Sequence, residues 1–210
     1  MMLDKKRSFC EIIGDTENGA RFLQDGKEFD AGGKMIGEGE NIARPGVSLI
    51  SDEMLQTMKD LAASTPKGCF VEVGVYRGGS AKVLYELGRK LFLYDTFSGI
   101  PVCGPEDQHS LGDFADCSYD DVCAEMPKAH VIKGVFPESL VKMPKVAFVH
   151  ADADQYESTA NICKVFPPLM AKGGMILFDD YRSLPGCVKA VDEFFPEREK
   201  LPDGRALVRF

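Results

Sequence analysis

The stretch Val71-Glu72-Val73-Gly74-Val75-Tyr76-Arg77-Gly78-Gly79-Ser80 decides the fold of this chain. It begins within an apolar run over residues 69–75, which is typical of a strand buried on both faces. A glycine-rich turn follows, and then a helical pattern whose apolar face includes Ala81, Leu84 and Leu87. Strand, glycine turn and helix in this order predict a cradle in which backbone N–H groups face a ligand.

The spacing of the glycines separates this turn from the dinucleotide-binding type. Gly74, Gly78 and Gly79 give the pattern Gly-x-x-x-Gly-Gly, whereas dinucleotide folds carry Gly-x-Gly-x-x-Gly. The carboxylate of Glu72, near the end of the predicted strand, would attract a cationic ligand and repel a pyrophosphate. The motif therefore favours S-adenosylmethionine (SAM), whose sulfonium and ammonium groups are positive. The alternative is a tight strand-to-helix turn that binds nothing.

Composition limits the class of protein. A chain of 210 residues fits one domain with a full core. Its net charge of −8 argues against a nucleic-acid partner, and no apolar run approaches the roughly 20 residues of a membrane span. The seven cysteines are scattered without a Cys-x-x-Cys pair, so we expect reduced thiols in a cytoplasmic protein. The sequence leaves open whether the chain forms a homo-oligomer.

Apolar runs and helical periodicities alternate along the chain after residue 48. Further strands are expected over 91–95, 130–134, 146–152, 175–178 and 205–210, and helices after Ser51 and Ser118 and over 158–170 and 188–195. Such alternation predicts an α/β fold, with a doubly wound, mostly parallel sheet covered on both faces and an antiparallel strand near its edge. Residues 1–48 show little periodicity, so we expect an irregular N-terminal arm before a domain that spans residues 49–210.

Acidic residues follow three of the expected strands. Asp95 closes the second strand, where a doubly wound sheet places a carboxylate on ribose hydroxyls; the alternative is an Asp that starts a turn. Asp152 with Asp154, and Asp179 with Asp180, follow two later strands. Because ligands gather at the carboxyl ends of parallel strands, these acids should converge near the glycine turn.

Carboxylates that crowd together repel one another unless a cation lies among them. All-oxygen ligands suit Mg²⁺, or another hard divalent cation such as Ca²⁺ or Mn²⁺. The alternative is that each acid caps the helix after its strand. The three histidines are scattered, and we interpret His150 as an inward-facing strand residue rather than a proton acceptor.

Several motifs in series resemble the macrocin O-methyltransferase family. They include Asp95-Thr96-Phe97-Ser98-Gly99-Ile100-Pro101, Asp152-Ala153-Asp154-Gln155-Tyr156 and Phe178-Asp179-Asp180-Tyr181, and with the glycine turn and residues 133–137, 173–174 and 190–195 they cover about residues 50–200. The resemblance implies a Rossmann-like methyltransferase fold that uses SAM and Mg²⁺. Two departures stand out: the family usually has an apolar residue at the position of His150, and Gln155 lies where related catechol-type enzymes carry a lysine.

The resemblance also assigns roles to residues of this chain. The residues expected around SAM are Glu72, Gly74, Tyr76, Gly78, Ser80, Asp95, Thr96, Phe97 and Gly134. The residues expected to hold the metal are Asp152, Asp179 and Asp180, and Asp152 is also expected to accept a proton.

The function expected from the sequence is the SAM-dependent transfer of a methyl group to a hydroxyl of a small molecule, either a sugar or a catechol-like compound. The divalent cation would bind that hydroxyl and lower its pKa. A metal-dependent hydrolase that uses the same acids is one alternative. A catalytically silent SAM-binding protein is the other.

Overall fold

A computed structural model describes residues 48–210 and, before them, four strands: β1 Glu11–Thr16, β2 Gly19–Gln24, β3 Lys27–Phe29 and β4 Met35–Glu38. The strands of the main sheet are β5 Cys69–Val73, β6 Leu91–Asp95, β7 His130–Lys133, β8 Val146–Ala151, β9 Met170–Phe178, β10 Glu199–Lys200 and β11 Ala206–Arg209. The α-helices are α1 Asp52–Ser64, α2 Gly79–Glu86, α3 Tyr119–Glu125, α4 Tyr156–Val165 and α5 Pro185–Phe194, with 3-10 turns η1 Pro167–Leu169 and η2 Asp180–Arg182.

The main sheet has the strand order β10-β11-β9-β8-β5-β6-β7. The strands from β9 to β7 in this order are parallel, whereas β11 and β10 are antiparallel to their neighbours. The prediction of a doubly wound, mostly parallel sheet with an antiparallel strand near one edge is therefore confirmed. From β5 the chain builds outward through β6 and β7, and then returns to add β8 and β9 on the other side. This switch point between β5 and β8 is where open α/β sheets bind their ligands.

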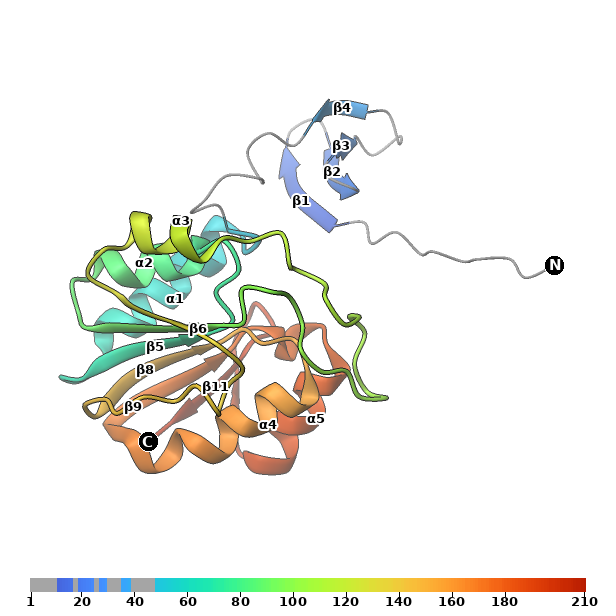
Figure 1. Cartoon of the computed structure of the whole chain (residues 1–210). Helices are drawn as coiled ribbons and strands as arrows, with labels where there is room; N and C mark the ends of the chain where they lie inside the picture. Colours follow the sequence, from blue (N-terminus) through green and yellow to red (C-terminus); the bar gives the residue numbers. More distant parts are fainter. Residues whose placement is uncertain (1–10, 17–18, 25–26, 30–34, 39–47) are drawn as a thin grey trace.

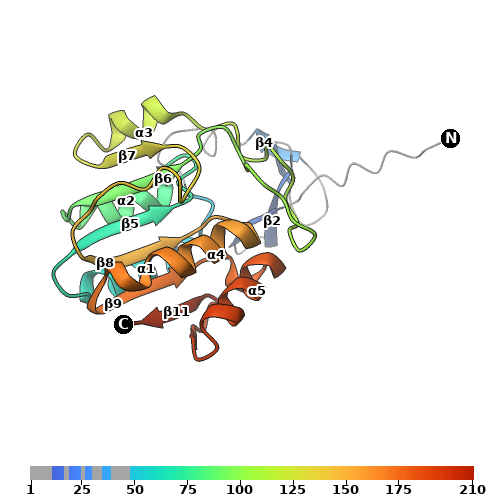
Figure 2. The same ribbon diagram turned by 60° about the horizontal axis from the view of Figure 1, so that its bottom comes forward.

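Helices cover both faces of the sheet (Figures 1 and 2). The helices α1, α2 and α3 pack on one face, where Met58, Leu84 and Val122 join a core cluster with Phe70 and Phe148 of the sheet. The helices α4 and α5 pack on the other face in a second cluster. The sheet residues alternate between the two clusters, as the period of two in a strand requires. None of the helices in the described part of the chain is long and apolar enough to cross a membrane.

Two segments differ from the sequence prediction. The α4 helix ends at Val165 rather than near residue 170, because Pro167 and Pro168 lack the N–H groups that continue a helix. The segment 1–48, expected to be irregular, contains the four strands β1–β4, which form an antiparallel sheet in sequence order. The pairing of Gln24 with Lys27 leaves two residues between β2 and β3, and the sequence there is Asp-Gly, a frequent two-residue hairpin. The domain boundary near residue 48 remains a prediction.

Candidate active site

A cavity of about 470 Å³ lies at the carboxyl ends of β5, β6, β8 and β9. Its wall combines the glycine turn after β5, the loop after β6 and the acids after β8 and β9. Nine of the predicted site residues line it: Gly74, Tyr76, Ser80, Asp95, Thr96, Gly134, Asp152, Asp179 and Asp180. The topology thus brings the predicted cofactor and metal residues into one space.

The other three predicted residues do not line this cavity. Gly78 is the N-cap of α2 with φ 82°, and a Cβ there would lie 3.0 Å from the side chain of Met126. Phe97 is buried in the core and packs edge-on against Tyr119. Glu72 is fully buried in the middle of the fold, so its expected direct contact with the cofactor has no support in the cavity wall.

Close packing of two strand ends explains why residue 74 is a glycine. Its φ is 87°, and a Cβ on this residue would lie 1.5 Å from the backbone oxygen of Asp152. A side chain at this position would therefore push apart the ends of β5 and β8, which the site needs side by side. Gly74 serves the assembly of the site whether or not a ligand approaches its backbone.

Asp95 holds the glycine turn in shape. Its Oδ2 accepts hydrogen bonds from the backbone N–H groups of Val75 and Tyr76 at 2.7 and 2.8 Å, and its Oδ1 accepts one from Phe97 at 2.7 Å. A carboxylate offers about four acceptor positions, so three backbone bonds leave room for one more donor. The ribose contact predicted for Asp95 is compatible with this arrangement and remains a prediction.

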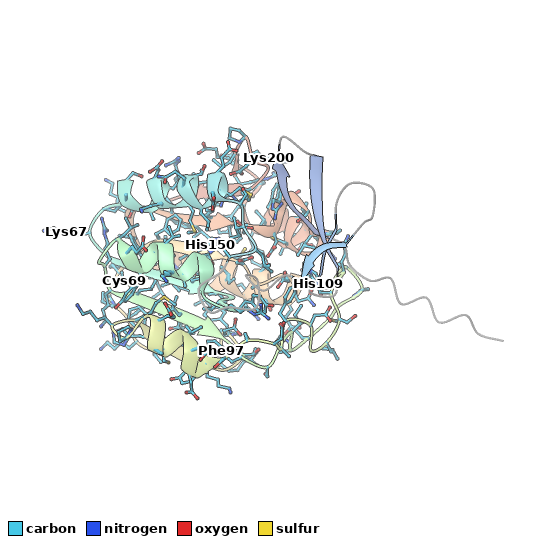
Figure 3. All side chains as sticks on the ribbon, turned by 90° about the horizontal axis from the view of Figure 1, so that it is seen from above. Lys67, Cys69, Phe97, His109, His150 and Lys200 are labelled. Carbon is cyan, nitrogen blue, oxygen red and sulfur yellow. The ribbon has the colours of Figure 1, made fainter. Side chains whose placement is uncertain are left out.

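A row of alternating charges crosses the sheet beneath the cavity. Glu72 of β5 pairs in register with His150 of β8, and the His150 Nδ1 lies 3.2 Å from the Glu72 Oε1. On the other side of the ring, Nε2 lies 3.6 Å from the Asp179 Oδ1, to which Nη1 of Arg205 donates at 3.2 Å. His150 and Arg205 have no exposed surface. His150 therefore faces inward, as expected, and lies within the main domain (Figure 3). Its two contacts also link a predicted cofactor residue to a predicted metal ligand.

The three metal candidates come together as predicted from the sequence. One carboxylate oxygen each of Asp152, Asp179 and Asp180 lies within 4.8 Å of the others. Burial, with the charges of Asp180 and Asp179 next, raises the pKa of Asp152 well above its usual value. Burial and the charge of Asp179 raise the pKa of Asp180 to about 7. The protein itself therefore leaves these two carboxylates short of positive charge.

Asp179 differs from its two neighbours. Burial alone would raise the pKa of Asp179, but the nearby cations His150 and Arg205 outweigh it and hold the pKa below its usual value. The pKa of His150 lies well above its usual value, because Asp179 and Glu72 outweigh the effect of burial. A divalent cation fits the donor set, since all three residues offer oxygen and the pKa values of Asp152 and Asp180 stay raised despite the nearby cations. Asp152, Asp179 and Asp180 are the residues that would hold it.

The alternative role of the acids as helix caps is not what the structure shows at α4. Its N-cap is Gln155, which makes no capping bond through its side chain. The N–H of Tyr156 instead donates to Oδ1 of Asp107, at 2.7 Å, from the loop over residues 96–117. Asp154 lines the cavity, and its N–H donates to Oδ2 of Asp180 at 2.9 Å.

The loop over residues 96–117 forms a strap, the name we use below for these residues. At one end, Asp116 accepts hydrogen bonds from the Tyr76 hydroxyl at 2.9 Å and the Arg77 guanidinium at 2.6 Å, on the glycine turn. In its middle part, the backbone oxygen of His109 accepts a hydrogen bond from the Gln155 Nε2 at 3.5 Å. The strap thus spans from the glycine turn to the acid cluster.

Sequence reasoning missed Arg205 and His109. Arg205 directly precedes β11, opposite the end of β9, and this register could have indicated a cation beside Asp179. His109 lies in a stretch without periodicity, so no sequence signal places it on the cavity wall.

Comparison with known proteins agrees with this geometry. The family model of the macrocin O-methyltransferases (TylF) matches residues 13–203. The chain belongs to the macrocin O-methyltransferase family. The match includes most of the segment before residue 48, which the resemblance in sequence motifs did not cover.

Two curated relatives of this macrocin-family chain are O-methyltransferases from Streptomyces. Demethyldecarbamoylnovobiocin O-methyltransferase of Streptomyces niveus is 26% identical over 167 residues, which are 68% of this chain and 64% of that protein. The chain thus spans less than two thirds of this relative's length. A tetracenomycin rhamnosyl 4'-O-methyltransferase of Streptomyces olivaceus is 26% identical over 199 residues, 82% of this chain and 76% of that protein.

Solved structures show the same fold. The O-methyltransferase NovP superposes with a TM-score of 0.68 at 22% identity, covering 82% of this chain and 88% of NovP. The calicheamicin methyltransferase CalS11 superposes with a TM-score of 0.59 at 19% identity, covering 75% of this chain and 77% of CalS11.

Proposed function

We propose that this protein transfers a methyl group from SAM to a hydroxyl oxygen of a small molecule, a sugar or a catechol-like compound, with the help of a divalent cation. The observation that carries the proposal is the single cavity in which the glycine turn of a methyltransferase-family chain faces a cluster of three carboxylates. A structural neighbour with a TM-score of 0.54, a Podospora anserina methyltransferase, was solved with S-adenosylhomocysteine (SAH) bound, which supports SAM as the donor.

Different residues of the chain form the cofactor side and the metal side of the cavity. The glycine turn, which Asp95 fixes through two backbone bonds, forms the cofactor side of the cavity. Asp152, Asp179 and Asp180 would hold the cation, and His150 and Arg205 keep Asp179 ionised despite its burial. When bound, a hard divalent cation lowers the pKa of the acceptor hydroxyl and orients it toward the methyl group. A carboxylate that ligates such a cation accepts a proton less readily, so the ligand role of Asp152 competes with its expected role as a base.

Calorimetry and turnover test this function together. We expect SAM and SAH to bind and NAD not to bind, and we expect methyl transfer to some member of a panel of sugar and catechol hydroxyls in the presence of Mg²⁺. Binding of NAD without binding of SAM would refute the donor. SAM binding without turnover on any acceptor would favour the catalytically silent alternative, and hydrolysis of a phosphate ester without methyl transfer would favour a hydrolase.

A further inference from the structure

The strap places an imidazole on the cavity wall beside the acid cluster. His109 lines the cavity, and its side chain is only 12% exposed. Its ring packs edge-on against Phe114, with ring centroids 5.0 Å apart, so the ring is held from one side. Its Nε2 lies 3.7 Å from Oδ1 of Asp154, the residue whose N–H donates to Asp180. Asp154 therefore contacts both His109 and Asp180 of the acid cluster.

We propose that His109 is the catalytic base that accepts the proton of the acceptor hydroxyl. This inference rests on the proposed methyl transfer. It assigns the acceptance of the hydroxyl proton to His109, because a carboxylate that ligates a cation accepts a proton less readily. As the hydroxyl oxygen bonds to the methyl carbon, the carbon–sulfur bond of SAM breaks and its electron pair stays on sulfur, which yields SAH. The hydroxyl proton passes to Nε2 of His109, and the imidazolium later releases it to water.

The surroundings of the ring suit a base that is neutral before the reaction and charged after it. Burial lowers the pKa of His109 below its usual value, against the opposing charges of Asp113 and Asp107, so the imidazole can accept a proton at neutral pH. The carboxylate of Asp113 lies 3.8 Å from Nδ1, and that of Asp154 lies 3.7 Å from Nε2. The charge of Asp113 would stabilise the imidazolium once it forms, as the acid does in a histidine-based triad. Burial and the charge of Asp180 raise the pKa of Asp154 well above its usual value, so Asp154 contributes less to this stabilisation.

A purely structural role is the rival explanation. The backbone oxygen of His109 bonds the strap to Gln155, and the His109 ring packs against Phe114 within the strap. The variant His109→Gln separates the two roles, since it keeps the backbone bond and a polar side chain but removes the base. His130→Gln is the matched control: His130 is exposed on β7 and stacks on Phe92, and it does not line the cavity.

For His109→Gln we expect kcat to fall by about 10²–10⁴-fold, with KM and SAM affinity changed little. We expect kcat of wild type and of His130→Gln to fall toward acidic pH. This fall should disappear in His109→Gln, and added imidazole should restore part of its activity. Unchanged kcat and an unchanged pH profile in His109→Gln would overturn the proposal. A raised KM or a weakened SAM affinity with kcat intact would also overturn it, because such a result is expected of a residue that only positions the strap.

A measurement independent of turnover completes the test. The chain has three histidines, so the imidazole ¹H–¹³C signals can be assigned with single variants and titrated in the complex with SAH and Mg²⁺. The His109 signal should titrate below the ordinary value of about 6.5. A His109 that stays charged above pH 8 would contradict its role as a base. If wild type shows no methyl transfer on the acceptor panel, the proposed function fails with this inference; if wild type is active and His109→Gln matches it, the inference alone fails.

Discussion

At the scale of single residues, the site depends on how its charges are balanced. The row Glu72, His150, Asp179 and Arg205 alternates in sign across four neighbouring strands, and all four side chains are buried. Asp179 has His150 and Arg205 on two sides, and they hold its pKa below the usual value. At Asp152 and Asp180, burial and the neighbouring carboxylates outweigh the nearby cations and leave the pKa values raised. Replacing one of these acids should therefore change the free energy of unfolding in the opposite direction from replacing another.

We predict opposite effects of two asparagine variants on the metal-free protein at pH 8. Asp180→Asn removes a buried carboxylate whose pKa burial and Asp179 raise, and it should increase the free energy of unfolding by roughly 1–3 kcal/mol. Asp179→Asn leaves Arg205 and His150 short of a partner and should lower it, by up to about 3–5 kcal/mol. Urea unfolding in EDTA measures both, and equal shifts of the two variants would contradict the charge pattern.

The pH dependence of stability follows from the same groups. The pKa of Asp180 in the folded protein is about 7, above the value of about 3.9 for an unfolded chain, so the folded state binds the proton more tightly. Its contribution to stability is complete below the unfolded pKa and is lost as the pH rises through 7. We expect the metal-free wild type to lose stability between about pH 4 and pH 7 more steeply than Asp180→Asn. Parallel curves for the two proteins in EDTA would show that Asp180 is already ionised at low pH.

Asp95 should affect both stability and cofactor affinity. Asp95→Ala removes two hydrogen bonds from backbone N–H groups of the glycine turn and one from Phe97, so we expect the melting temperature to fall. If the carboxylate also binds ribose hydroxyls, SAM affinity should fall by on the order of 1–3 kcal/mol. Thermal melts and calorimetry separate the two effects, and a destabilised variant with full SAM affinity would reduce Asp95 to a structural role.

At the scale of elements, a helix cap is one of the contacts that join the strap to the domain. Oδ1 of Asp107 accepts from the first N–H of α4, while its Oδ2 accepts from the N–H of Gly104 at 2.7 Å. The neighbouring Glu106 forms only an ion pair with Lys189 on the surface. The two adjacent acids therefore offer a matched comparison.

Asp107→Ala should lower the free energy of unfolding by about 0.5–2 kcal/mol, because it leaves a helix N-terminus without its cap. Glu106→Ala should change it by less than about 1 kcal/mol, as is usual for a surface ion pair. Chemical unfolding of the two variants measures the difference. A larger loss for Glu106→Ala would show that the ion pair, not the cap, anchors the strap.

The elements of the main domain could be predicted because local signals mark their ends. Ser51 and Ser118 cap their helices through the side chain as expected, and apolar runs mark the parallel strands. The apolar pattern predicts the end of α4 too late, because it continues to Leu169 past Pro167 and Pro168, which cannot continue the helix. The strands before residue 48 were missed because they are short and their alternation is weak, although the Asp-Gly turn was visible.

At the scale of the whole molecule, the topology creates the site. Reversal of strand order between β5 and β8 places the glycine turn beside the acids that follow β8 and β9. The convergence of Gly74, Asp95, Asp152, Asp179 and Asp180 could be predicted from the sequence because strand ends of a parallel sheet share one edge. The burial of Glu72 could not be predicted, because it depends on which face of its strand meets which helix. The position of Arg205 could not be predicted either, because it depends on a strand pairing between segments distant in sequence.

The measurement that tests the central claim most directly is methyl transfer with and without a divalent cation, for an acceptor that wild type methylates. We predict that EDTA abolishes turnover, that Mg²⁺ restores it, and that SAM affinity and the fold survive EDTA, because the core does not depend on the acid cluster. Asp180→Asn should be inactive even with Mg²⁺ present while it binds SAM normally. Full methyl transfer in EDTA would contradict the account and return Asp152, Asp179 and Asp180 to a structural role.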